Sequence, residues 1–302
     1  MNLSTDGLVL ASDAAIDLHL HTTYSDGRWA PEQLLDYLVR EQFGLAAITD
    51  HDRTDTAAAL QELAMEKHIP LLTAVEMTTV WHDEMSAQRI DAMSGLPEMT
   101  DLLCFGFDPG PSALNDIAQD QQRRQRENTQ EVYENLLRKG YAFPESPDEL
   151  AALLETPSPQ QPHELAALLK RHGYGTGQPS AGRIILEAGC VFATNDLAAV
   201  VEAAHQSGAV CLVAHPGHAE GFVTYDAALL DKLRQEVAID GLEVYQPKHT
   251  PEQAAMYLEY AQQHHLLISC GSDSHKPEKP PIRYPAELSR TLLERLGICI
   301  KV

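Results

Sequence analysis

Short apolar runs alternate along the chain with longer segments that carry the periodicity of an amphipathic helix. The runs are rich in β-branched residues and are bounded by turn-forming residues, which is the pattern of buried strands. The pattern predicts strands at residues 16–20, 45–49, 70–75, 102–107, 210–214, 241–245 and 266–270. Most of the segments between them are long enough for a helix.

Two of these helical segments have recognisable starts. Pro31 lies in the first turn of one, where the missing N–H of proline costs no hydrogen bond. Thr250 precedes Pro251 at the start of another and is predicted to be its N-cap. Because strands and helices alternate, we expect a parallel sheet, and 302 residues suffice for one large α/β barrel.

The stretch 109–194 breaks the alternation. It contains a polar helical segment at 115–139, followed by a series of prolines and further short helical patterns. We expect a helical insertion, or cap subdomain, in a barrel domain formed by residues 1–108 and 195–302.

The charge balance limits the partners of the chain. A formal net charge of −22, from 44 acidic and 22 basic side chains, argues against a basic track along duplex nucleic acid. A phosphorylated substrate must then be bound locally, and a cluster of divalent metal ions reverses the local potential efficiently. No obligate protein partner is inferred.

Cysteine usage and hydropathy bear on the compartment. The 5 cysteines form no C-x-x-C pair, which argues against a disulfide scaffold and a thiolate zinc site. The amino terminus lacks the features of a signal peptide, and no apolar stretch approaches the roughly 20 residues of a membrane span. The expectation is a soluble cytoplasmic protein without a membrane partner.

The first predicted strand ends in a pair of histidines. His19 and His21 stand at i and i+2, so their side chains project to one side of the strand, about 6.5 Å apart along it. A single H-x-H pair is more often a pair of surface histidines than a metal site. Similar residues at the ends of other predicted strands make a metal site the better interpretation.

Four other predicted strands also end in metal-binding residue types, in the segments 49–52, 215–216 and 271–275 and at Glu76. The carboxyl ends of parallel barrel strands form the face on which such barrels place their active sites. Mixed imidazole and carboxylate ligands suit Zn, Mn or Fe(II) and indicate a catalytic rather than a structural site.

At these motifs the chain resembles the polymerase and histidinol phosphatase (PHP) family of metal-dependent phosphoesterases. The motifs stand in family order over nearly the whole chain: H-L-H-T-T-Y-S-D-G at 19–27, I-T-D-H-D at 48–52, V-E at 75–76, A-H-P at 214–216, G-L-E-V-Y at 241–245 followed by His249, and G-S-D-S-H at 271–275. The resemblance implies a distorted seven-stranded (β/α)7 barrel with an inserted helical subdomain and two or three divalent ions (Mn, Zn or Fe).

The resemblance also implies a ligand set. One metal would take His19, His21, Glu76 and Asp273, a second would take Asp26, His51 and His275, and a third, bridged by Glu76, would take His215. Family members usually give the third metal another histidine, but Leu103 stands at that place. The third site is therefore absent, completed by His82, or filled by water or substrate phosphate.

The expected reaction is in-line attack on a phosphate ester by a metal-bridged hydroxide. Asp50 and His249 are candidate catalytic residues. Asp50 either orients an imidazole or makes a structural hydrogen bond to a neighbouring loop. Candidate substrate-binding residues are Arg183, His218, Lys248 and Arg126, although a charge run such as the one around Arg126 is usually a solvated helix face.

The helical insertion is closest to family members that act on nucleotides, so we expect a small phosphorylated substrate such as a nucleotide, a nucleoside bisphosphate or a short oligonucleotide. The alternatives are a 5'-3' exonuclease acting on short RNA, a histidinol-phosphate phosphatase and a catalytically silent PHP module. A hydrolase of carbon–nitrogen bonds is a further alternative, because amidohydrolase barrels also begin with H-x-H.

Overall fold

The computed structural model describes residues 5–82, 98–143 and 148–301. The chain has a mixed α/β fold and divides into two compact units. The first comprises Met1–Ala118 and Asn195–Val302, and the second comprises Gln119–Thr194. Each unit is described by itself.

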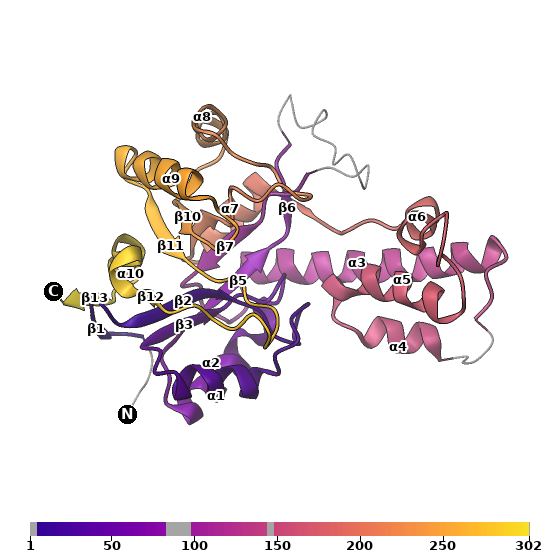
Figure 1. Ribbon diagram of the computed structural model, residues 1–302, viewed down its shortest axis with the longest axis horizontal. Helices are drawn as coiled ribbons and strands as arrows, with labels where there is room; N and C mark the ends of the chain where they lie inside the picture. The colour runs from indigo at the N-terminus through magenta and orange to yellow at the C-terminus, as the bar shows by residue number, and fades with distance from the viewer. Residues whose placement is uncertain (1–4, 83–97, 144–147, 302) are drawn as a thin grey trace. The chain divides into compact units, whose positions relative to one another are not determined.

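The first unit is built on two main sheets (Figure 1). A five-stranded sheet has the order β11 (Leu267–Cys270), β10 (Gly241–Tyr245), β9 (Val210–Val213), β7 (Leu102–Phe105) and β5 (Ala74–Met77). A four-stranded sheet has the order β12 (Tyr284–Pro285), β2 (Ala15–Leu20), β3 (Leu45–Ile48) and β4 (Leu71–Leu72).

The described strands do not form the closed seven-stranded barrel that was expected. Isolated bridges between Leu20 and Ser274 and between His51 and Glu76 connect the carboxyl ends of the two sheets. The single strand expected at 70–75 is divided at Thr73 into β4, which belongs to one sheet, and β5, which belongs to the other. The sheets therefore meet at the ends of their strands, where the candidate ligands lie.

The expectation of a parallel sheet is wrong at β7. This strand pairs antiparallel with both β5 and β9, with Glu76 opposite Leu103 and Cys104 opposite Cys211. The other pairs among β2, β3, β4, β9, β10 and β11 are parallel. The beginning of β7, rather than its end, consequently lies at the edge formed by the ends of β5 and β9.

Helices cover the outer faces of the first unit. They are α1 (Pro31–Arg40), α2 (Ala57–Lys67), α7 (Leu197–Gln206), α8 (Ala227–Glu236), α9 (Pro251–Gln263) and α10 (Arg290–Arg295), with short 3-10 turns at Thr54–Thr56 and Ala286–Ser289. In Figure 1, α1 and α2 lie side by side next to β3, and α9 lies next to β10. Small two-stranded pairs join β1 (Val9–Ala11) to β13 (Cys299–Lys301) and β6 (Thr79–Val80) to β8 (Asn195–Asp196).

The helix starts follow from the sequence. Pro31 occupies the first turn of α1, which buries Leu34, Leu35 and Leu38 on one face. Thr250 caps α9 in a complete capping box with Gln253, which confirms the predicted N-cap. Within the described ranges, no helix is both long enough and apolar enough to cross a membrane.

An apolar core lies between the two sheets. Leu18 and Leu45 from the four-stranded sheet pack in one buried cluster with Leu103 and Leu212 from the five-stranded sheet. Full burial of each such side chain contributes roughly 1.5–3 kcal/mol of hydrophobic free energy. This core fixes the strands whose ends carry the polar cluster.

The second unit is helical. Its elements are the greater part of α3 (Ala113–Arg138), α4 (Glu149–Glu155), a 3-10 turn at Ser158–Gln160, α5 (Gln161–Arg171) and α6 (Ala181–Glu187). It has its own buried core, to which Leu136, Leu165 and Ile184 contribute. Ser180 caps α6 by accepting a hydrogen bond from the Arg183 backbone N–H.

Candidate metal centre

Imidazole and carboxylate side chains converge where β2, β3, β5, β9 and β11 end. His19 lies in β2 and His21 directly follows it, and their Nε2 atoms are 3.1 Å apart. Both rings are fully buried, as is Glu76 of β5. Residues far apart in the sequence thus present their ligand atoms to one small volume.

The first group of ligand atoms comes from His19, His21, Glu76 and Asp273, and all of these atoms lie within 4.8 Å of one another. Oε2 of Glu76 is 2.9 Å from Nε2 of His19 and 3.0 Å from Nε2 of His21. Oδ1 of Asp273 is 3.6 and 3.4 Å from the same two nitrogens. Ligands bound to one ion at 2.0–2.2 Å lie roughly 3–3.5 Å apart, so the group fits one divalent ion.

The second group comes from His21, Asp26, His51 and His275, again within 4.8 Å of one another. Nε2 of His275 is 3.2 Å from Oδ2 of Asp26, and Nδ1 of His21 is 3.6 Å from Oδ1 of Asp26. His21 therefore faces both groups, whereas the sequence resemblance placed it in the first alone.

The residues present fit divalent metal ions. Nδ1 of His21 is buried and has no hydrogen-bond partner among the described residues, although it faces Asp26. Burial raises the pKa of the Glu76 carboxyl, but attraction to His19 and His51 outweighs it and holds the pKa well below its ordinary value. An ionised carboxylate among imidazole nitrogens is a ligand set that suits first-row divalent ions.

Glu243 of β10 orients two of the candidate ligands. Its Oε1 is 3.0 Å from Nδ1 of His19, and its Oε2 accepts a hydrogen bond of 2.8 Å from the backbone N–H of His215. The motif G-L-E-V-Y contains Glu243, to which the sequence alone assigns no role. The available signal was an acidic residue in the middle of an otherwise apolar, buried strand, which demands a polar partner.

Gly271 leaves the space that the centre requires. A Cβ atom at this position would lie 2.2 Å from Cβ of His19 and 2.7 Å from Oε1 of Glu243. Asp17 secures the same region, because its carboxylate accepts hydrogen bonds of 2.9 Å from the backbone N–H groups of Ser272 and Ile282. The glycine of G-S-D-S-H is therefore a steric requirement of the centre.

Three residues at the strand ends have left-handed backbone conformations. Asp52, His215 and Asp273 have φ values of 57°, 28° and 54°. Residues other than glycine seldom adopt positive φ, and such strain is concentrated at functional sites. In this protein the three positive φ values occur where the chain turns after β3, β9 and β11.

Asp50 binds a loop. Its Oδ1 accepts hydrogen bonds from the backbone N–H of Thr22 (2.7 Å) and from Oγ of Ser25 (2.6 Å), and its Oδ2 accepts one from Oγ1 of Thr22 (2.6 Å). These bonds fix the loop that carries Asp26. The geometry favours the structural alternative for Asp50 over the orientation of an imidazole.

Both ring nitrogens of His249 have partners. Nδ1 is 2.9 Å from the carbonyl oxygen of Val244, and Nε2 accepts a hydrogen bond of 3.2 Å from the backbone N–H of Gly217. In this arrangement the imidazole fixes the loop after β9 and is not free to exchange a proton with substrate. The geometry therefore does not favour the catalytic role expected for His249.

Lys248 and His218 lie beside the centre. Nζ of Lys248 is 2.9 Å from Oδ2 of Asp273, and the lysine side chain is 45% exposed. The His218 ring stacks on Phe222 at 4.9 Å and lies 5.5 Å from the ring of His215. Burial lowers the pKa of His218 to about 4, so this imidazole is neutral near pH 7.

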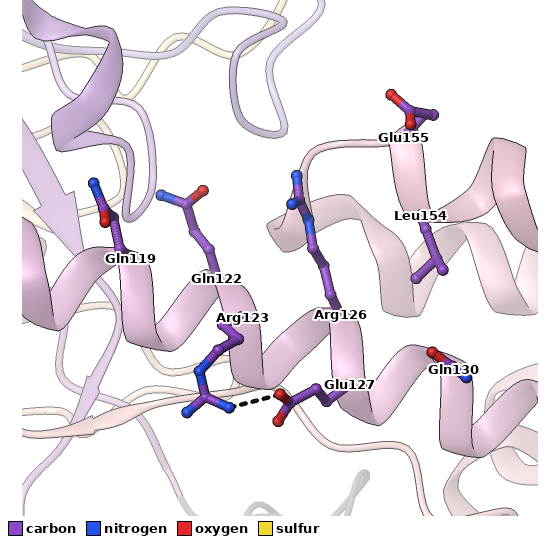
Figure 2. A pocket seen from close by; sticks show the side chains of 8 residues that line it. All are labelled: Gln119, Gln122, Arg123, Arg126, Glu127, Gln130, Leu154 and Glu155. Carbon is purple, nitrogen blue, oxygen red and sulfur yellow. Dashed lines mark hydrogen bonds and ion pairs between the residues drawn. The ribbon is translucent and has the colours of Figure 1, made fainter.

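Arg183 and Arg126 belong to the helical unit. Nε of Arg183 forms an exposed ion pair of 2.7 Å with Glu187. Arg126 lines a pocket of about 500 Å³ whose other lining residues are Gln119, Gln122, Arg123, Glu127, Gln130, Leu154 and Glu155. Figure 2 shows Arg126 extending from α3 on the same side as Gln122, while Arg123 turns away and pairs with Glu127.

The expected partner of His215 is replaced. Leu103 is buried in the apolar core, and His82 is exposed. Asp101, which immediately precedes β7, is buried instead, with one carboxylate oxygen 4.0 Å from Nε2 of His215. The sequence did not indicate this residue, because the resemblance places the expected histidine at Leu103, whereas the structure brings Asp101, two residues earlier, to His215.

Comparisons with known proteins identify relatives that act on phosphoester bonds. No family model matches the chain. It is 29% identical over 270 residues to the 5'-3' exoribonuclease Rnm of Salmonella typhimurium, covering 86% of this chain and 85% of that protein. It is 26% identical to the 3',5'-nucleoside bisphosphate phosphatase of Chromobacterium violaceum, covering 87% and 88%.

A solved structure supports the same class. A metal-dependent phosphoesterase from Bifidobacterium adolescentis matches with a TM-score of 0.69 and 25% identity, covering 93% of this chain and 96% of that one. The fold and the site define this chain as a metal-dependent phosphoesterase, a hydrolase that acts on phosphoester bonds. The relatives are named for hydrolysis of phosphoester bonds and the solved structure for metal-dependent phosphoesterase activity, which agrees with the resemblance of the motifs to the PHP family.

Proposed function

We propose that the chain hydrolyses phosphate monoesters of nucleotides or nucleoside bisphosphates at a pair of divalent ions (Mn, Zn or Fe). The observation that carries the proposal is the convergence of two groups of ligand atoms that share His21. Ions held there would neutralise the phosphate oxygens and lower the pKa of a water molecule. The ligands are His19, His21, Asp26, His51, Glu76, Asp273 and His275.

Lys248 and His218 are the proposed substrate-phosphate contacts. The Lys248 ammonium already lies beside a carboxylate of the centre, and almost half of its side chain is open to solvent. A neutral His218 retains one ring N–H, which donates a hydrogen bond to a phosphate oxygen without adding charge. Because the net charge of the chain is −22, its surface as a whole does not attract anions. Groups beside the centre must therefore bind the phosphate.

The helical insertion, residues 109–194, is proposed to act as a cap that binds the part of the substrate that does not react. Arg183 and Arg126 supply guanidinium groups there, and guanidinium groups bind phosphate in a bidentate geometry. The relatives named for activity on nucleoside bisphosphates and on RNA cover most of this chain, which supports a nucleotide-containing substrate.

A second candidate is 5'-3' exonucleolytic cleavage of short RNA. It is supported by 29% identity to the Salmonella exoribonuclease over most of both chains. The two candidates require the same phosphoester chemistry and differ in what lies beyond the scissile phosphate. Substrate length therefore distinguishes them.

A substrate panel tests the proposal. Protein loaded with Mn2+ would be assayed on mononucleotides, 3',5'-bisphosphates, histidinol phosphate and short 5'-phosphorylated RNA, with release of phosphate and of nucleotides measured separately. We expect the highest kcat/KM on a bisphosphate or mononucleotide. Preferred stepwise release of nucleotides from RNA would favour the second candidate, and preference for histidinol phosphate would favour that phosphatase.

Two variants test the centre itself. Asp273→Asn and His51→Ala should each abolish turnover and leave the circular dichroism spectrum unchanged, because each removes a ligand without removing core packing. Asp36→Asn is the matched control, since Asp36 forms only a surface ion pair with Lys67. Full turnover in both ligand variants would contradict the site, and metal binding by wild-type protein without turnover on any phosphoester would favour the silent module.

A further inference from the structure

Asp101 has an unusual environment for a carboxylate. Its side chain is 1% exposed, and its Oδ1 has no hydrogen-bond partner among the residues that the structure describes. Its position is fixed by the antiparallel strand β7, because its backbone carbonyl accepts a hydrogen bond of 2.9 Å from the N–H of Ala214. The side chain therefore lies at the edge where the ligands gather.

Neighbouring ligand atoms face Asp101. Nε2 of His215 lies 3.1 Å from Oε1 of Glu76 and 4.0 Å from Oδ2 of Asp101. Ligand atoms of His51, Glu76 and Asp101 lie within 4.8 Å of one another. Oε2 of Glu76 faces His19 and His21 instead, so its two oxygens point to different groups of ligands.

The other buried acids near the centre are satisfied by hydrogen bonds. Both oxygens of Asp50, of Asp17 and of Glu243 have hydrogen-bond partners on loops or imidazoles. A buried carboxylate with an unsatisfied oxygen beside a second carboxylate is costly unless a cation or a proton compensates its charge. Asp101 therefore differs from acids that serve only the fold.

We propose that Asp101 takes the place of the histidine that Leu103 does not supply and, with Glu76 and His215, completes the ligands of a third divalent cation. Two carboxylates and one imidazole form a site richer in oxygen than the two histidine-rich groups beside it. Oxygen ligands favour Mn2+ relative to Zn2+ more than imidazole ligands do. The third position should therefore discriminate less strongly against Mn2+ than the two histidine-rich groups do. This inference rests on the two-ion centre of the proposed function.

Metal counting tests the site directly. Protein stripped by chelation and re-equilibrated with Mn2+ would be desalted and its bound manganese measured by mass spectrometry. Wild-type protein and the matched control Asp36→Asn should bind three ions per chain, whereas Asp101→Asn and His215→Ala should each bind two. Two ions in wild-type protein, or three in Asp101→Asn, would overturn the proposal.

Stability without metal separates a ligand from a structural residue. Asp101→Asn replaces a buried carboxyl group that faces Glu76 with a neutral amide of the same size. The Tm of the metal-free variant should therefore equal or exceed that of metal-free wild-type protein, while the rise in Tm caused by Mn2+ should shrink. A lower metal-free Tm with an unchanged metal-induced rise would assign Asp101 a structural role and overturn the proposal.

A competition experiment on wild-type protein is independent of how any variant folds. When Mn2+ is titrated against zinc-loaded protein, one of the three bound ions should exchange for manganese at a lower ratio of Mn2+ to Zn2+ than the other two. Uniform exchange of all three ions would overturn the predicted preference. Failure of the third site leaves two ions and phosphoesterase activity intact. Failure of the proposed function would instead appear as wild-type protein with no turnover on any phosphoester.

Discussion

At the scale of single residues, the centre depends on side chains that the metal ions would not touch. Glu243 holds both the His19 imidazole and the backbone of His215, and it is fully buried. Asp50 holds the loop that carries Asp26. Hydrogen bonds of this kind fix the tautomer and the direction of metal-binding imidazoles.

Glu243→Gln should weaken metal binding. The amide keeps the shape of the side chain but loses the charge that supports the His19 ring, and loss of such a partner costs about 10- to 100-fold in metal affinity. Isothermal titration calorimetry with Mn2+ measures the change in affinity. An affinity within twofold of wild type would show that Glu243 supports the fold alone.

Gly271→Ala should damage both stability and metal binding. The new Cβ would lie 2.2 Å from Cβ of His19, so β2 and β11 must separate. We expect a loss of about 1–3 kcal/mol, as for other overpacked sites, together with weaker Mn2+ binding. Gly182→Ala is the control, because nothing lies within 4 Å of a Cβ there. Equal denaturation midpoints for the two variants would refute the steric argument.

At the scale of elements, the direction of β7 decides which of its residues reach the centre. The antiparallel strand places Leu103 in the apolar core opposite Glu76 and brings Asp101 to the polar edge. The start of α9 makes a second connection, since Gln253 completes the capping box and also donates a hydrogen bond of 3.1 Å to the carbonyl of Gly217. That loop begins at His215.

Thr250→Ala should destabilise α9 and leave the two-ion centre intact. Removing the hydroxyl leaves a helical N–H without its partner, which costs about 1 kcal/mol. Thr250→Ser should retain most of the stability because serine caps equally well. Urea unfolding measures both variants, and equal stability of the alanine and serine variants would argue against the cap.

At the scale of the whole molecule, the two compact units have separate cores, and the metal centre lies in the first. Ligand binding stabilises the structure that forms the site, by about 2.7 kcal/mol for one ion at 100 times its Kd. Stabilisation by metal should therefore be confined to one unit.

Metal removal tests this expectation. Chelation should speed hydrogen exchange in the loops that carry the ligands, at residues 19–27 and 271–275, and leave the helices at Glu149–Glu155 and Gln161–Arg171 unchanged. Hydrogen exchange measured by mass spectrometry resolves the two units. Equal acceleration throughout the chain would show that the units unfold together.

The sequence by itself predicted the element types, the resemblance to PHP-family phosphoesterases and the motifs of the candidate metal centre. Its strands are short apolar runs whose ends carry His19, His51, Glu76 and His215, and local patterns of this kind require no knowledge of long-range pairing. Thr250 was identifiable as a cap for the same reason, because capping depends on neighbouring residues.

Only the tertiary structure decided strand direction, sheet closure and the partners of buried polar atoms. β7 is a continuous apolar run that is buried on both faces, like its neighbour β9. Its pattern therefore could not show that it runs antiparallel or that Asp101 rather than Leu103 faces His215. Nor could it show that both nitrogens of His249 are engaged. These features depend on contacts between residues far apart in the chain, which a local pattern does not encode.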